Sequence, residues 1–111
     1  MAYDEELANR VREQLAPYDA VTEKAMFGGL AFLVAGNMAV GITNTAELMV
    51  RLGPEEGEAA LGEPHVRPFD MTGRPMRGWI VVERSGIGTD AQLGGWVERG
   101  VAFARSLPPK G

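Results

Sequence analysis

The sequence predicts one α+β domain of two layers, in which three helices pack on an antiparallel sheet in the order α-β-β-β-α-β-β-α. Apolar residues recur at helical spacing near both ends of the chain, and short apolar runs separated by Gly and Pro turns lie between them. With 45% hydrophobic and 23% charged side chains, 111 residues supply one hydrophobic core without disulfides or metals. Because no repeat or linker divides the sequence, we expect residues 1–111 to form this single domain.

The first helix is predicted from its cap, its charges and its stop. Asp4 is a favourable N-cap residue, and Glu5 and Glu6 follow it at the positive end of the helix dipole. Pro17 ends the helix. Between these limits one apolar stripe recurs every fourth residue, formed by Leu7, Val11 and Leu15.

A hairpin follows in a stretch of 22 uncharged residues, 25–46. Its length would suit a membrane span, but four glycines and Asn37 at its middle favour strands instead. The two predicted strands, 30–35 and 38–42, flank Gly36-Asn37, which is a common two-residue hairpin loop. That loop sets Leu33 opposite Val40, so Leu30, Phe32 and Val34 share the other face of the hairpin.

The rest of the chain alternates short elements. A strand over 48–52 has half-buried alternation, and Pro54 suits the first turn of a short helix that ends near Gly62. Residues 66–71 form an edge strand with a turn at Thr72-Gly73, and 79–83 form the last strand. A final helix begins at Thr89 or Asp90 and stops before Pro108-Pro109.

The candidate interaction residues are Leu30, Phe32 and Val34. They are more apolar than the solvent-facing side of an antiparallel sheet normally is. Exposed apolar patches often mark interfaces. We therefore expect a protein partner over this face, either a second copy forming a homodimer or a different protein, which the sequence does not identify.

An alternative hypothesis rests on arginines in the basic half of the chain. Residues 1–63 carry 11 acidic and four basic side chains, whereas residues 64–111 carry four and seven. Arg67, Arg74 and Arg77 could contact an anion or a nucleic acid within a larger complex. The sequence pI of about 5.0 argues against specific nucleic-acid binding by the isolated domain.

Reactive side chains are scarce. The chain has no Cys and one His, His65, so we expect no metal site, no cofactor and no catalytic residues. Nothing in the sequence pairs His65 with either serine, Ser85 or Ser106. Residues 86–91 match G-x-G-x-x-G/A, but the strand and acid that a dinucleotide site needs do not follow, so we interpret them as a glycine turn and helix cap. We expect a protein that is not an enzyme.

The compartment follows from the first residues. Residues 1–6 lack the basic and apolar regions of a secretory signal, so we expect a cytoplasmic protein without a membrane anchor.

Four segments together resemble the TfoX N-terminal domain family over about residues 4–107. They are Lys24-Ala25-Met26-Phe27-Gly28-Gly29-Leu30-Ala31-Phe32 with Gly36, Leu48-Met49-Val50-Arg51, Pro68-Phe69-Asp70-Met71-Thr72-Gly73-Arg74-Pro75-Met76, and Leu93 with Trp96. The resemblance implies a two-layer fold grouped with secretion-chaperone-like folds, and a bacterial regulator of natural competence that acts with a cyclic-AMP receptor protein. It implies no catalytic or ligand residues. We expect a standalone member of this family.

Overall fold

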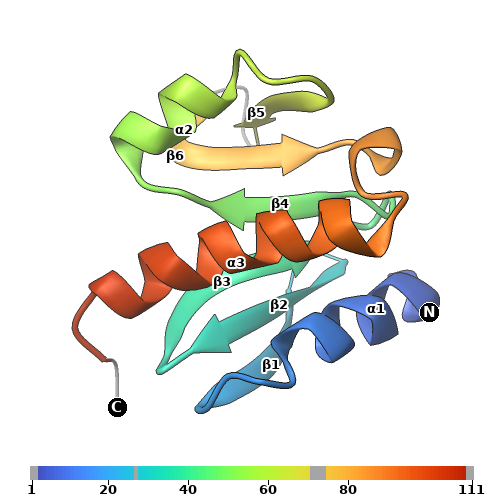
Figure 1. Ribbon diagram of the computed structural model, residues 1–111, viewed down its shortest axis with the longest axis vertical. Helices are drawn as coiled ribbons and strands as arrows, with labels where there is room; N and C mark the ends of the chain where they lie inside the picture. Colours follow the sequence, from blue (N-terminus) through green and yellow to red (C-terminus); the bar gives the residue numbers. More distant parts are fainter. Residues whose placement is uncertain (1–2, 27, 71–74, 110–111) are drawn as a thin grey trace.

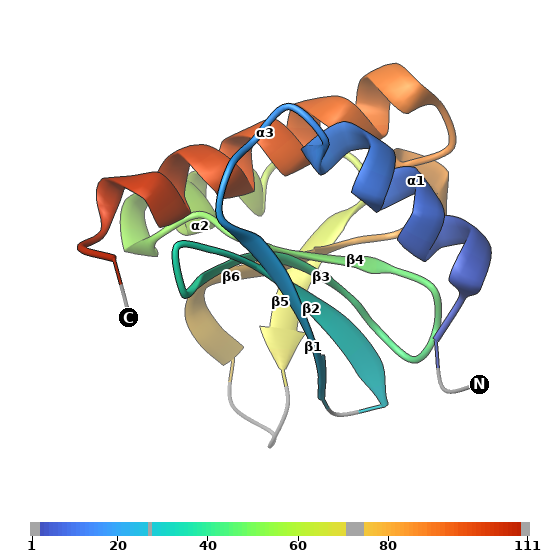
Figure 2. The ribbon, with the colours of Figure 1, turned by 90° about the horizontal axis from the view of Figure 1, so that it is seen from below.

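In the computed structural model, which describes residues 3–26, 28–70 and 75–109, one sheet carries helices on one of its faces (Figure 1). Its six strands follow the order β1-β2-β3-β4-β6-β5, and each neighbouring pair is antiparallel. Seen along the sheet, the helices form a layer above it, and no helix of the described residues lies below it (Figure 2). The predicted α+β fold is confirmed.

The elements follow the chain in a regular order. They are α1 (Glu5–Leu15), β1 (Val21–Met26), β2 (Gly29–Val34), β3 (Asn37–Ile42), β4 (Leu48–Arg51), α2 (Pro54–Ala60), β5 (Val66–Asp70), β6 (Pro75–Val82), a 3-10 turn η1 (Arg84–Gly86) and α3 (Asp90–Ser106). β1 was not predicted, so the predicted order lacks one strand. The predicted turn at Thr72-Gly73 lies outside the described residues.

Both long helices begin at side-chain caps. The Asp4 carboxylate accepts hydrogen bonds from the amides of Glu6 (2.9 Å) and Leu7 (3.2 Å). At α3, the Thr89 hydroxyl accepts from the Gln92 amide (3.1 Å), and the Gln92 side chain accepts from the Thr89 amide (3.0 Å). Residues 86–89 thus lead into a capped helix, as interpreted from the sequence.

The β2–β3 hairpin turns one residue earlier than predicted. Val34 pairs with Asn37, so the loop is Ala35-Gly36, whose φ angles of 52° and 84° suit a type I′ turn. A bulge between Phe32 and Leu33 then sets Phe32, and not Leu33, opposite Val40. Asn37 therefore begins β3, and its buried side chain donates to the Pro108 carbonyl oxygen at 2.9 Å, which anchors the segment after α3.

The predicted interaction residues lie in the core. Leu30, Phe32 and Val34 are 4%, 0% and 3% exposed, and they pack in one cluster with the apolar stripes of α1 and α3. The expectation that a partner covers this face is therefore wrong: the chain's own helices cover it. The amphipathic helices and the apolar hairpin face are two sides of one core.

Helices α3 and α2 approach the sheet closely at glycines. A Cβ atom at Gly100 of α3 would lie 2.5 Å from the Ala39 carbonyl oxygen of β3. A Cβ atom at Gly57 of α2 would lie 2.8 Å from the Cα of Gly78 on β6, where Gly78 has a φ of 90°. Side chains at these positions would push each helix off the sheet.

Candidate functional site

The candidate site is the face of the sheet that points away from the helices, which we call the open face (Figure 2). Strand alternation divides the side chains between the faces: Leu48 and Val50 of β4 join the core under the helices, so Met49 lies on the open face. The same alternation gives the open face an apolar set formed by Met26, Ala31, Leu33, Met38, Met49, Phe69, Trp79 and Val81. Leu33, Met38 and Phe69 in this set are partly exposed, whereas Ala31, Met49 and Val81 are buried. Trp79 lines a second hollow together with Leu61 at the end of α2.

A hollow of about 270 Å³ lies on the open face. Met26 of β1 and Phe69 of β5 both line it, although these strands are the two opposite edges of the sheet. Met49 and Val81, from strands between those edges, line it as well, as does the β3–β4 loop. The sheet therefore curls around this hollow, and the open face is concave there.

Methionines form an adaptable part of the open face beside the hollow. A Cβ atom at Gly41 would lie 2.8 Å from the Cε of Met38 and 2.8 Å from the Cε of Met49, so the two methyl groups meet over this glycine. Unbranched thioether side chains adjust to neighbours of different shape. This surface can therefore accommodate apolar side chains of more than one kind.

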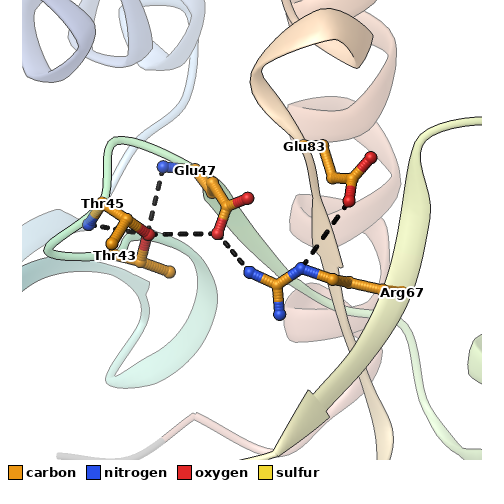
Figure 3. A network of polar contacts seen from close by, with 5 residues as sticks. All are labelled: Thr43, Thr45, Glu47, Arg67 and Glu83. Atoms are coloured by element: carbon orange, nitrogen blue, oxygen red, sulfur yellow. Dashed lines mark hydrogen bonds and ion pairs between the residues drawn. The ribbon is translucent and has the colours of Figure 1, made fainter.

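A polar network borders the hollow (Figure 3). The Thr43 hydroxyl oxygen accepts from the amides of Thr45 (3.3 Å) and Glu47 (3.0 Å), which fixes the loop, and the Thr45 hydroxyl donates to the Glu47 carboxylate at 3.0 Å. The Arg67 guanidinium donates to the same carboxylate, and its Nε lies 3.9 Å from the Glu83 carboxylate. One arginine thus lies between two acids, and we call these three residues the Glu47–Arg67–Glu83 cluster.

Of the arginines of the alternative hypothesis, the structure describes Arg67 and Arg77, and it does not bring these two together. Arg67 is already paired with carboxylates. It lies opposite Val81, and Arg77 precedes Val81 by four residues on β6, a separation of about 13 Å along the strand. Arg74 lies outside the described residues. The geometry offers no joint anion contact by Arg67 and Arg77.

Comparison with known families decides the family. The model of the TfoX N-terminal domain matches residues 13–104. The chain belongs to the TfoX N-terminal domain family. Neither a curated protein nor a solved structure matched the chain. The family match spans the whole sheet of this TfoX N-terminal domain, so the open face and its hollow lie within the family region.

Ser85 and His65, which no sequence pattern pairs, are brought together in this TfoX N-terminal domain. Pairing of Val66 with Val82 places the two residues side by side, and the Ser85 hydroxyl lies 2.7 Å from His65 Nδ1. Both are exposed, and no acidic side chain of the described residues hydrogen-bonds to the imidazole. A hydroxyl and an imidazole are therefore adjacent, but among the described residues no acidic side chain orients the imidazole as the third member of a catalytic triad does.

An ion pair between α1 and β1 has a structural role. The Arg12 guanidinium donates two hydrogen bonds to the Glu23 carboxylate, at 2.7 and 2.8 Å. These bonds lower the pKa of Glu23 and raise that of Arg12. The pair ties the edge strand β1 to helix α1.

The described residues form neither a cluster suited to a metal ion nor a helix suited to a membrane. Within the part of the chain that the structure describes, no three acidic or histidine side chains are grouped so as to hold a metal ion. No helix in that part is long and apolar enough to cross a membrane.

The residues of the open face were partly visible in the sequence. Met49 alternates with Leu48 and Val50, which places it on the face away from the core. The hollow itself had no sequence signal, because it depends on the two edge strands approaching each other.

Proposed function

We propose that this TfoX N-terminal domain is a non-enzymatic regulatory domain of the bacterial cytoplasm that acts by binding another protein through its open face. The observation that carries the proposal is the concave apolar surface on the helix-free side of the sheet. Partly exposed side chains on it include Leu33, Met38 and Phe69. Apolar surface of this kind marks interaction sites.

The lining of the hollow favours protein binding over catalysis. Its volume of about 270 Å³ is just below the roughly 300 to 1,000 Å³ of most small-molecule pockets. Met49 and Val81 form its buried apolar floor, and every buried side-chain nitrogen or oxygen among the described residues has a hydrogen-bond partner. The polar side chains of its lining are those of Thr43, Asn44, Thr45, Glu47 and Arg67. A surface of this kind is suited to one or two apolar side chains of a partner.

Quantitative capture from the native cell tests the proposal. The full chain serves as bait in three forms: wild type, Leu33→Asp on the open face, and Ala102→Asp on the exposed side of α3 as a control that adds the same charge. Circular dichroism confirms that each bait is folded. We expect wild type and the α3 variant to retain the same protein, and the open-face variant to lose it. Equal retention by all three baits would overturn the proposal.

A further inference from the structure

We propose that the open face receives an amphipathic helix of a partner protein, with a Lys or Arg of that helix over the Glu47–Arg67–Glu83 cluster. This inference rests on the proposed function and adds the chemistry of the partner. It follows from the shape of the face, the state of the sheet edges, the apolar lining and the charge beside the hollow.

The shape of the face requires a convex occupant. Met26 and Phe69, on opposite edges of the sheet, line one hollow. A second copy would present the same hollow, and two concave surfaces leave a void between them, which forfeits packing contacts. A helix is convex along its whole length, and about 14 residues of helix span the roughly 20 Å of a six-residue strand.

The edges of the sheet are poor templates for an added strand. The edge strand β5 contains Pro68, which has no amide hydrogen to donate, and its pairing with β6 is irregular at this point. The other edge strand, β1, exposes Glu23 and Lys24. Charged residues and proline at edges oppose pairing with a further strand. The partner therefore docks with side chains on the face and not through main-chain pairing.

The lining of the face selects apolar side chains on one side of that helix. Met26, Leu33, Met38 and Phe69 are the partly exposed apolar side chains of this face, and the buried Met49 and Val81 form the floor beneath them. An amphipathic helix presents such side chains at positions i, i+3 or i+4, and i+7.

The charge beside the hollow selects a cation at one end of the helix. Glu47 and Glu83 share a single guanidinium, that of Arg67, so the cluster carries an excess of one negative charge. The side chain of Glu83 is 49% exposed and its closest approach to Arg67 is 3.9 Å, whereas Glu47 is 16% exposed and directly hydrogen-bonded. Glu83 is therefore the carboxylate that remains accessible to a Lys or Arg of the partner.

Peptide selection tests this inference. A phage-displayed library of 14-residue peptides is selected on the full wild-type chain and depleted on the folded Met26→Glu/Phe69→Ser variant, with Leu33→Asp as a second depleting variant should the first not fold. We expect enriched peptides with the helical apolar spacing and a Lys or Arg near one end. By fluorescence anisotropy, Glu83→Lys should weaken the best peptide about fivefold, and Glu98→Lys on α3 should leave its affinity unchanged.

Three results would overturn the inference: no enrichment, enriched peptides that are acidic or rich in proline, or a homodimer in light scattering that Leu33→Asp dissociates. The last result identifies a second copy as the occupant. The proposed function fails separately, when capture of a native protein does not depend on the open face. If capture depends on this face but the selected peptides are not helical, only the helical partner is refuted.

Discussion

Two glycines of α3 test how closely the helix layer packs on the sheet. Gly95 and Gly100 are both interior positions of the same helix, so replacing either with Ala gains the same helix propensity, about 0.5 to 1 kcal/mol. They differ in what the new methyl group meets. At Gly95 nothing lies within 4 Å, whereas at Gly100 the Ala39 carbonyl oxygen is 2.5 Å away and Val40 Cγ1 is 2.8 Å away.

The magnitude follows from that contact. An ordinary carbon–oxygen contact is about 3.3 to 3.6 Å, so Gly100→Ala must move α3 away from β3 by about 1 Å. Overpacking costs about 1 to 3 kcal/mol, and a 2.5 Å contact with a backbone atom belongs to the upper part of that range, about 2 to 3 kcal/mol. After subtraction of a propensity gain of about 1 kcal/mol, a net loss of about 1 to 2 kcal/mol remains. Gly95→Ala carries no such cost and should stabilise the protein.

Thermal and urea unfolding, followed by circular dichroism, measure the difference. At about 4 °C per kcal/mol for a domain of this size, Gly95→Ala should raise Tm by about 2 to 4 °C and Gly100→Ala should lower it by about 4 to 8 °C. If Gly100→Ala raises Tm as much as Gly95→Ala does, the close approach of α3 to β3 is refuted.

Three further predictions concern single contacts. Asn37→Ala removes the bond to the Pro108 carbonyl from a residue that is 2% exposed, so the free energy of unfolding should fall by about 1 kcal/mol in urea titrations. Asn9→Ala, which removes an exposed hydrogen bond from Arg12, is the control and should lower it by less. Because the pKa of Glu23 is lowered in the folded state, its pair with Arg12 stabilises the protein above the ordinary pKa of a glutamate and is lost as the pH falls through the folded pKa. Both side chains are 35% exposed, so Glu23→Gln should lower the free energy of unfolding at pH 7 by less than about 1 kcal/mol. The variant should also lose less stability than wild type when the pH is lowered below 4, and an equal loss would contradict this role of the pair. Ser85→Ala should leave stability within about 0.5 kcal/mol of wild type, because its bond to His65 is exposed, and a larger loss would show that this contact holds β5 to η1.

Local patterns were enough to predict most of the fold. The stripe of Leu7, Val11 and Leu15 and the stops at Pro17 and Pro108 act within one helix, and the structure has these helices. The strand at 21–26 was missed because Thr22, Glu23 and Lys24 are exposed, as suits the edge of a sheet, and therefore show no apolar alternation. The hairpin register was wrong by one residue because Ala35 adopts a φ of 52°, which its residue type does not signal.

The candidate site was harder to predict because its position depends on which face of the sheet the helices cover. Both faces of the hairpin are apolar, and the sequence does not say that α1 and α3 cover the one that carries Phe32. The covered face became the core, and the opposite face, with the partly exposed Leu33 and Met38, has no helix of the described residues over it. The Glu47–Arg67 contact joins residues twenty positions apart, and only the strand order brings them together.

Methyl NMR of the methionines tests the central claim most directly. The full chain, labelled with ¹³C at the methionine methyl groups, is titrated with the purified partner recovered by capture. Met26, Met38 and Met49 lie on the open face, whereas Met76 of β6 is 39% exposed outside the hollow and serves as an internal control. We predict that the partner shifts the methyl resonances of the first three and leaves that of Met76 in place. Binding that shifts Met76 and leaves the other three unchanged would contradict the assignment of the open face as the interaction surface.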